Sequence, residues 1–333
     1  MALRGPLKIV IPGGSGQVGT ILARHFHEQG HDVTVLSRRA KPAPWRTSRW
    51  DGLEIAEWVK DIDGSDVVIN LAGRSVNCRY NAANRRQILN SRTITTGLVG
   101  RAIAQAAHPP AVWLNASTST IYRHSLDRPM DEATGELGGN GPGNSTAWDF
   151  SVEVALSWER ACFAAQTPRT RRVAMRSAMI MSPDCGGAFD TLLRLGRYGL
   201  AGTVGPGNQF VSWIHDVDFV RAVEFLIERE EMEGPVNVCS PCPVPNRFFM
   251  RCLRHAWCTS HIGIPSPRWA LEIGAFLLGT ETELLLKSRR VVPKRLLDAS
   301  FDFHFPNWRG ASQDLVHRWR ECRPGQSLSP AVS

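Results

Sequence analysis

The sequence lacks several features that mark particular classes of protein. No apolar run approaches the roughly 20 residues that span a bilayer, and the residues before the first apolar segment are too few for a signal peptide. The net charge is +8, but the arginines and lysines are scattered and form no block of like charges. We therefore expect a cytoplasmic protein with no membrane segment and no nucleic-acid partner.

The eight cysteines do not form the framework of a small disulfide-rich domain, because the chain is long and shows no secretory signal. One group has enough thiols and imidazoles to suit zinc, namely Cys239, Cys242, Cys252, His255, Cys258 and His261. However, Cys239 ends an apolar strand, and Cys252 falls on an amphipathic helix, where cysteine acts as a small hydrophobic residue. We expect no metal site.

A glycine-rich turn near the N-terminus is the most informative segment. Residues 8–12 are predicted to form a strand, Gly13, Gly16 and Gly19 follow at regular spacing, and a helical pattern runs over 20–29. Such a turn lets the backbone approach a pyrophosphate, and the helix N-terminus directs free N–H groups at it. The segment predicts a dinucleotide-binding turn, and a tight turn without a ligand is the alternative.

The end of the next predicted strand, residues 31–36, indicates which dinucleotide binds. In dinucleotide-binding folds an acidic residue here binds the ribose of NAD, whereas an arginine accommodates the 2′-phosphate of NADP. This chain has Ser37, Arg38 and Arg39 and no carboxylate. A guanidinium suits a phosphate, so we predict NADP(H) as the cofactor. A solvated basic turn is the alternative.

Strand and helix patterns alternate over the first two thirds of the chain and predict a Rossmann-type, doubly wound parallel α/β sheet. The expected strands are residues 8–12, 31–36, 48–50, 66–71, 111–115 and 172–176. The expected helices are residues 20–29, 84–107 and 150–165, with a surface loop over the site at 125–147.

The composition changes in the last third of the chain, where prolines cluster. We expect an NADP-binding domain over residues 1–233 that includes parts of a substrate cleft, a small C-terminal α/β substrate lobe over 234–323, and a disordered tail over 324–333. Within the lobe, residues 269–287 suggest one or two apolar helices. Residues 300–306 suggest a short edge strand or a cap on the main sheet.

These landmarks together resemble the extended short-chain dehydrogenase/reductases. They are most similar to an atypical branch named as epimerase-family proteins, which are related to nucleoside-diphosphate-sugar epimerases. Beyond the glycine turn, the matching segments are residues 70–73 (NLAG), 91–96, 158–159, 205–218, 234–237, 245–246, 285–293 and 301–306. The resemblance therefore covers nearly the whole chain.

The resemblance also implies which residues hold the cofactor. They are Gly13, Ser15, Gly16, Gln17, Val18 and Gly19 at the pyrophosphate, Ser37, Arg38 and Arg39 at the 2′-phosphate, Leu71, Ala72 and Gly73 at the adenosine side, Gln87 and Arg92 on the next helix, and Met179 and Ile180 beside the nicotinamide. For Arg92, an ion pair on the surface is the alternative.

The usual proton donor of this superfamily, a tyrosine followed four residues later by a lysine, is missing. None of the three tyrosines has that lysine, and the corresponding helix carries Asp149-Phe150-Ser151 instead. Near the fifth strand, Thr118 and Tyr122 offer hydroxyls and are our candidates for handling a proton. Without a lysine, the pKa of Tyr122 should stay near roughly 10, and a purely structural tyrosine is the alternative.

Two functions from different classes remain. The first is an NADP-dependent oxidoreductase or epimerase-like enzyme that acts on an unidentified small molecule with an atypical proton donor. The second is a non-catalytic NADP(H)-binding protein that senses redox state or docks a partner. The missing Tyr–Lys pair favours the second, and the complete cofactor motif favours the first. His215 and Asp218 offer a proton relay, but they precede a helix and we expect them to be structural.

Overall fold

The computed structural model describes residues 5–39, 42–138, 146–197, 202–257 and 286–322. The expected disordered tail lies outside these residues, as do Cys258, His261 and nearly all of the apolar stretch 269–287. In the described part of the chain, no helix combines the length and the apolar character that crossing a bilayer requires.

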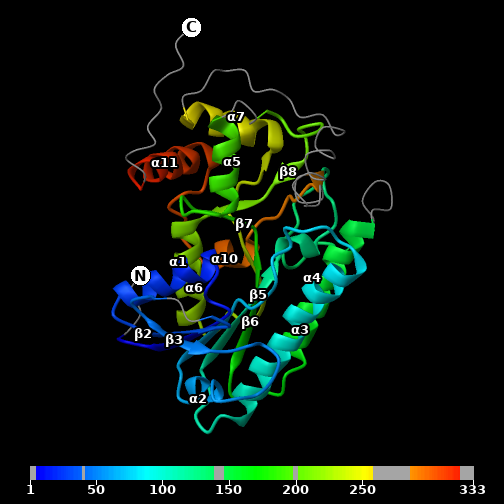
Figure 1. The fold of residues 1–333 in the computed structure, drawn as a ribbon. Helices are drawn as coiled ribbons and strands as arrows, with labels where there is room; N and C mark the ends of the chain where they lie inside the picture. The colour runs from blue at the N-terminus through cyan, green and yellow to red at the C-terminus, as the bar shows by residue number, and fades with distance from the viewer. Residues whose placement is uncertain (1–4, 40–41, 139–145, 198–201, 258–285, 323–333) are drawn as a thin grey trace.

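A seven-stranded sheet forms the lower part of the molecule, and its neighbouring strands are all parallel (Figure 1). In spatial order the strands are β10 (Gly234–Val238), β6 (Arg171–Ser177), β5 (Val112–Thr118), β4 (Val67–Asn70), β1 (Lys8–Pro12), β2 (Asp32–Ser37) and β3 (Arg46–Arg49). The chain moves outward from β1 to β3 and returns to β4 on the other side of β1. This reversal confirms the predicted doubly wound sheet, and ligands of such sheets bind where the strand order reverses.

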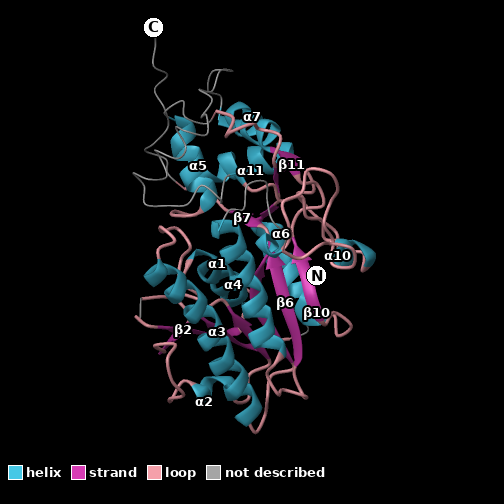
Figure 2. Cartoon of the chain, turned by 90° about the vertical axis from the view of Figure 1, so that its right-hand side faces the viewer, coloured by secondary structure: helices cyan, strands magenta, loops and turns pink. Residues whose placement is uncertain are grey.

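Helices cover both faces of the sheet. They are α1 (Gln17–Glu28), α2 (Val59–Ile62), α3 (Ala82–Gln105), α4 (Thr146–Phe163), α6 (Asp216–Glu228) and α10 (Lys294–Asp298). Ile9 and Ile11 of β1 lie in a core shared with α1 and α6, whereas Val10 lies in the opposite core with α3. On that second face α4 packs beside α3 (Figure 2). Burial on both sides explains why the strands are almost continuously apolar in sequence.

The last strand of the sheet comes from residues that we expected in the C-terminal lobe. Residues 234–238, at the start of the expected C-terminal lobe, form the outer strand of the main sheet as β10. They pair in parallel with β6, Gly234 lying opposite Val173. An apolar run predicts a buried strand, but it does not specify which strand it pairs with. The division of the chain into domains at residue 233 stays a prediction.

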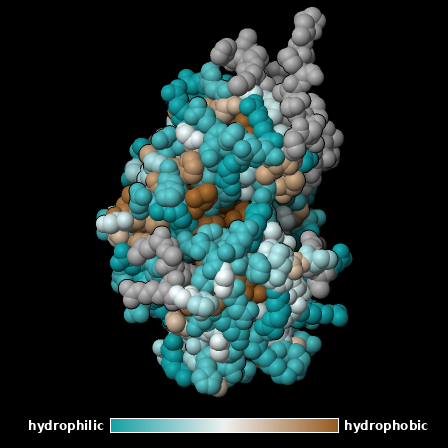
Figure 3. Space-filling model, turned by 90° about the vertical axis from the view of Figure 1, so that its left-hand side faces the viewer, coloured by the Kyte–Doolittle hydropathy of each residue, from teal (hydrophilic) through white to brown (hydrophobic). Residues whose placement is uncertain are grey.

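The upper part of the molecule has a separate core. Its elements are β7 (Met179–Met181), α5 (Ala188–Arg197), β8 (Phe210–Val211), β9 (Trp213–His215), β11 (Val244–Pro245), α7 (Asn246–Trp257) and α11 (Trp308–Glu321). Trp308 stacks on Phe249 with ring centroids 4.0 Å apart and meets Trp213 edge to face at 5.0 Å. On the face drawn in Figure 3, most of the surface is hydrophilic, and exposed apolar side chains gather in a hollow near its middle.

Residues 300–306 form the predicted cap and not a strand. Phe301 packs into the core between the sheet and α6 and meets Phe225 edge to face at 5.3 Å. Asp218 fixes the following residues, because its carboxylate accepts hydrogen bonds from the backbone N–H groups of His304 and Phe305, both at 2.8 Å.

A buried ion pair joins α4 to the sheet. Arg176 of β6 donates through Nε and Nη2 to the two carboxylate oxygens of Glu159, both at 2.8 Å. The Ser117 hydroxyl of β5 donates to the same carboxylate at 2.6 Å. Burial alone would lower the pKa of Arg176. The hydrogen bonds to Glu159 and the negative charge of that carboxylate outweigh burial and raise the pKa of Arg176. A buried pair of this kind is costly to break, because the remaining charge stays in the interior.

We predict that Glu159→Gln lowers the free energy of unfolding by about 3–5 kcal/mol, because it leaves the Arg176 charge buried without its counter-ion. Urea denaturation followed by circular dichroism measures the loss. Glu153→Gln is the matched control, since Glu153 is an exposed residue on the same helix. Equal stability of the two variants would contradict this account of the ion pair.

Candidate functional site

A cavity of about 1030 Å³ lies at the carboxyl ends of β1, β2 and β4. Its walls come from four places in the chain: the glycine turn, the ends of β2 and β3, the residues that follow β4, and the N-terminal half of α3. Of the predicted cofactor residues it is lined by Gly13, Ser15, Gly16, Gln17, Val18, Gly19, Ser37, Arg38, Leu71, Ala72, Gly73, Gln87 and Arg92. The sheet topology thus brings these separate segments into one site.

The three spaced glycines of the turn meet different constraints. Gly13 has φ +75°, and a Cβ there would lie 2.6 Å from the Cα of Ala72. A Cβ on Gly19 would lie 2.3 Å from the Cα of Gly14. In contrast, a Cβ on Gly16 would meet nothing within 4 Å. The first and third glycines are therefore required by packing, and Gly16 faces open space in the cavity.

The N-terminus of α1 has the features of an anion-binding site. The helix begins at Gln17, three residues earlier than predicted, and no side chain caps its N-terminus. Its first turn contains no acidic residue. Free backbone N–H groups and the helix dipole at this end both favour negative charge.

A buried amide holds the turn after β4 in place. Asn70 donates through Nδ2 to Oδ1 of Asn115 at 2.7 Å, and its Oδ1 accepts a hydrogen bond from the backbone N–H of Ala72 at 3.1 Å. Gly73 follows, where a Cβ would lie 3.2 Å from Cζ of Arg92. The chain after β4 therefore lies between the glycine turn on one side and Arg92 on the other.

Arg92 is held in the wall of the cavity and does not form a surface ion pair. Its guanidinium lies 5.0 Å over the ring of Trp158 and donates to the carbonyl of Ile88 at 3.1 Å. Burial lowers its pKa to about 10. The described part of the chain thus engages this guanidinium with Trp158 and a backbone carbonyl, which favours the cavity position over the alternative of a surface ion pair.

The lining of the cavity is strongly basic. Arg38, Arg74, Arg86 and Arg92 contribute four guanidinium groups, against one carboxylate from Asp51 among the described residues. The Asp51 carboxylate accepts a hydrogen bond from the backbone N–H of Leu53 at 2.8 Å, so it is used within its own loop. Arg74 and Arg86 were missed in the sequence, where they look like ordinary surface arginines. The feature that could have identified them is their position, because Arg74 follows β4 closely and Arg86 lies in the first turns of α3.

Three predicted cofactor residues do not line the cavity. Arg39 is exposed outside it. Met179 and Ile180 are half-buried on β7, where Ile180 packs against the core of the sheet and Met179 against the upper core. Gln17 of the cavity lining contacts the segment after β7, because its Nε2 donates to the carbonyl of Asp184 at 3.2 Å.

Tyr122 is buried and its hydroxyl is engaged in the interior, which corrects the expectation that it handles a proton. The hydroxyl donates to Oδ1 of Asn237 and accepts from Nη1 of Arg176, both at 2.9 Å. Burial raises its pKa to about 12, although Arg176 and Asn237 act in the opposite direction. The expected value near 10 was wrong, and the structural alternative for this tyrosine is the one that the geometry supports.

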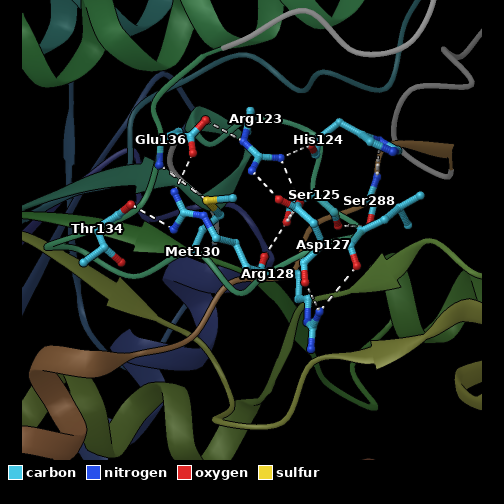
Figure 4. Close-up of polar contacts among 11 residues, drawn as sticks. Arg123, His124, Ser125, Asp127, Arg128, Met130, Thr134, Glu136 and Ser288 are labelled. Atoms are coloured by element: carbon cyan, nitrogen blue, oxygen red, sulfur yellow. Dashed lines mark hydrogen bonds and ion pairs between the residues drawn. The ribbon is translucent and has the colours of Figure 1, made fainter.

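The neighbouring guanidinium of Arg123 turns away from the phenol. It pairs with Asp127 at 2.8 Å and with Glu136 at 2.7 Å, and Arg128 binds the other oxygen of Glu136 (Figure 4). These ion pairs fold residues 123–136 back on themselves. The guanidinium therefore stabilises the loop and not a phenolate.

Thr118 ends β5 and is half-buried at the carboxyl edge of the sheet. Its Oγ1 accepts a hydrogen bond from the backbone N–H of Thr120 at 3.2 Å and so caps the short helix η1 (Ser119–Ile121). Thr118 is absent from the lining of the cofactor cavity. Its predicted role with the substrate stays a prediction.

The possible proton relay is structural. His215 is fully buried, and its Nδ1 accepts a hydrogen bond from the N–H of Val217 at the start of α6. Its Nε2 lies 2.9 Å from a carboxylate oxygen of Asp314 on α11. Burial lowers the pKa of His215, so it stays neutral at neutral pH. His215 thus joins the two parts of the molecule and does not face the cavity.

The cysteines are dispersed. Cys239 is buried, and burial raises the pKa of its thiol. Cys242 is exposed, and Cys252 lies in the upper core. Within the described ranges, no three His, Cys, Asp or Glu side chains gather as metal ligands do.

Comparison with known proteins identifies relatives over most of the chain. The model of the "NAD dependent epimerase/dehydratase family" matches residues 9–239, and that of a "Domain of unknown function (DUF1731)" matches residues 266–315. The "Epimerase family protein SDR39U1" of Mus musculus is 31% identical, over 93% of this chain and all of the relative. An "Epimerase family protein" of Staphylococcus epidermidis is 29% identical, over 93% of this chain and 99% of the relative.

Two solved structures share the fold closely. Human epimerase family protein SDR39U1 (isoform 2) with NADPH matches with a TM-score of 0.80 and 27% identity, over 93% of this chain and 99% of that one. A nucleoside-diphosphate sugar epimerase from Corynebacterium glutamicum matches with a TM-score of 0.73 and 26% identity, over 94% of this chain and 58% of that one.

We predict that Tyr122→Phe lowers stability by about 1–3 kcal/mol, because Arg176 and Asn237 each lose a buried hydrogen-bond partner. A tyrosine whose pKa is raised on folding from 10.0 to about 12 contributes stability that is present below pH 10 and is lost as the pH rises toward 12. Urea unfolding measured across this range should therefore show a steeper decline in wild type than in Tyr122→Phe. Parallel declines would indicate that the phenol titrates as if exposed.

Proposed function

The chain belongs to the NAD dependent epimerase/dehydratase family, and from this premise we propose that it binds NADP(H) in the cavity between β1 and β4. We further propose that it uses this cofactor in an oxidoreductase or epimerase-type reaction on a small molecule in the cytoplasm. The observation that carries the proposal is the cavity itself. It combines an open glycine turn at a helix N-terminus with four arginines and one carboxylate among its described lining residues.

The glycine turn suits the pyrophosphate. Gly16 leaves open space where any side chain would stand, and the uncapped N-terminus of α1 lies directly behind it. Ser15 and Gln17 flank this point on the cavity wall. Backbone N–H groups of this segment would bind the phosphate oxygens, as at other dinucleotide-binding turns.

The end of β2 suits a 2′-phosphate better than a free ribose hydroxyl. Arg38 lines the cavity there, and the acidic residue that selects NAD is absent from the strand end. The Ser37 hydroxyl donates to the carbonyl of Arg39 at 3.0 Å and so shapes the turn that presents Arg38. The NADPH in the human SDR39U1 structure agrees with this choice.

The remaining cations lie where further negative charge of the cofactor would be balanced. Arg92 is a desolvated guanidinium behind Gly73, and Arg74 follows Gly73 directly and hydrogen-bonds to Gln87. A desolvated cation interacts more strongly with an anion than an exposed one does. These residues would hold and orient the dinucleotide, which supplies or accepts the hydride.

A non-catalytic NADP(H)-binding protein is the second candidate, and one observation favours it. Tyr122, the tyrosine nearest the end of β5, is buried in the interior, and its neutral form is stabilised there. A catalytic role then requires other groups at the end of β5. The two candidates share the cofactor site and differ in whether a substrate binds beside it.

We predict that wild type prefers NADPH to NADH and that Arg38→Ala loses roughly 1.5–3 kcal/mol of NADPH affinity with little change for NADH. The reason is the loss of a charge-assisted hydrogen bond to the 2′-phosphate. Fluorescence titration with each dinucleotide measures both affinities. Arg39→Ala is the matched control, since Arg39 is the next residue and lies outside the lining. Equal affinity of wild type for the two dinucleotides would defeat the proposal of NADP(H).

A further inference from the structure

We propose that the end of β5 carries a subsite for an anionic oxygen group of the substrate, a carboxylate or a phosphate, formed by Thr118, Thr120, Lys287 and Arg289. The inference rests on the proposed function, because it adds a substrate site beside the proposed cofactor site. It also assigns chemistry to the end of β5, where Thr118 was expected to meet a substrate.

The position of β5 places this group beside the cofactor cavity. β5 is the next strand after β4 in the sheet, with Asn115 opposite Asn70, and the residues after β4 line the cavity. Thr118 lies further along β5 in the same direction. Ligands of open parallel sheets bind outside these carboxyl ends. A substrate that reacts with the cofactor would therefore meet the end of β5.

The two threonines are the less buried residues of this segment, and their hydroxyls are linked. Thr118 and Thr120 are half-buried. Ser117, which precedes Thr118, and Ser119, which lies between the two threonines, are buried. The two Oγ1 atoms lie 3.1 Å apart and are hydrogen-bonded. A pair of linked hydroxyls can donate to an anionic oxygen or accept from a protonated one.

A distant segment of the chain brings two cations to the same threonine. Lys287 is 2% exposed, and its Nζ donates to the carbonyl of Thr120 at 2.9 Å. Arg289 donates through Nε to Oγ1 of Thr120 at 3.2 Å. Ammonium and guanidinium groups beside two hydroxyls are the donors that carboxylates and phosphates prefer.

This segment is anchored on both sides, so the cations are held in place before a ligand arrives. The Ser288 backbone N–H donates to Nδ1 of His124 at 3.1 Å, and its hydroxyl donates to the carbonyl of Ser125 (Figure 4). On the other side the Ser212 hydroxyl donates to the carbonyl of Arg289 at 2.8 Å. Fixed donors need no rearrangement when negative charge develops nearby, which is the basis of electrostatic catalysis.

The neighbouring imidazole of His124 adds no charge to the subsite. Burial, followed by the charges of Lys287 and Arg123, lowers the pKa of His124. Its Nδ1 accepts a hydrogen bond, and its ring stacks on Trp148 with centroids 5.2 Å apart. His124 is thus a neutral wall beside the subsite, with Lys287 and Arg289 as the cations directed at Thr120.

The test is a calorimetric titration of the NADP⁺-saturated protein with inorganic phosphate and, separately, with malonate, at constant ionic strength. Saturation with NADP⁺ occupies the anion-binding groups of the cofactor cavity, so that they do not contribute to the measured binding. We expect wild type to bind one of the two anions. Binding of phosphate would indicate a substrate that carries a phosphate group, and binding of malonate would indicate one that carries a carboxylate. Arg289→Gln and Lys287→Met should each weaken that binding about tenfold or more. Arg101→Gln, which removes an exposed arginine of α3, should not.

Each other result counts against the subsite. If wild type binds neither anion, or if Arg101→Gln weakens binding as much as Arg289→Gln does, the four residues only fasten the segment to β5. Circular dichroism identifies a variant that fails to fold, and Arg289→Lys then replaces it, with intermediate affinity expected. Failure of wild type to bind NADP⁺ refutes the proposed function instead, and the comparison of wild type with Arg289→Gln without cofactor still decides the subsite.

Discussion

The backbone of the glycine turn lies directly against the chain that leaves β4, and the site depends on this contact. A Cβ on Gly13 would stand 2.6 Å from the Cα of Ala72, so no other residue fits there without displacing one strand end. The contact brings together the two strands at which the sheet reverses its order. It leaves Gly16 facing open space and sets the arginines that follow β2 and β4 around one cavity.

The end of β5 and the interior beside it hold two separate groups of polar side chains. The interior beside β5 holds Tyr122 in a network with Arg176 and Glu159, which stabilises α4 against the sheet. A phenol in that network favours its neutral form and cannot reach the cavity. The groups that do reach the edge of the sheet are the hydroxyls of Thr118 and Thr120, with cations supplied from the C-terminal segment. Binding of an anionic group is the chemistry that this set suits.

Local features of the sequence were enough to predict the sheet and the glycine turn, because strand, turn and helix follow one another within about thirty residues in a βαβ unit. Features that depend on distant pairing were not predicted. The partner of Tyr122, Asn237, lies 115 residues away, and Lys287 lies 167 residues from Thr120. The pairing of β10 with β6 and the approach of Arg74 and Arg86 to the cavity depend in the same way on the assembled fold.

Substitution of Gly16 by valine tests the central claim most directly, because this is the glycine of the turn whose side-chain position is open to the cavity. Calorimetric titration with NADPH, alongside circular dichroism and thermal unfolding, separates binding from folding. Since a Cβ on Gly16 contacts nothing in the protein, we predict an unchanged fold and loss of NADPH binding. A folded Gly16→Val variant that binds NADPH as wild type does would contradict the account, because the turn would then be a structural feature alone.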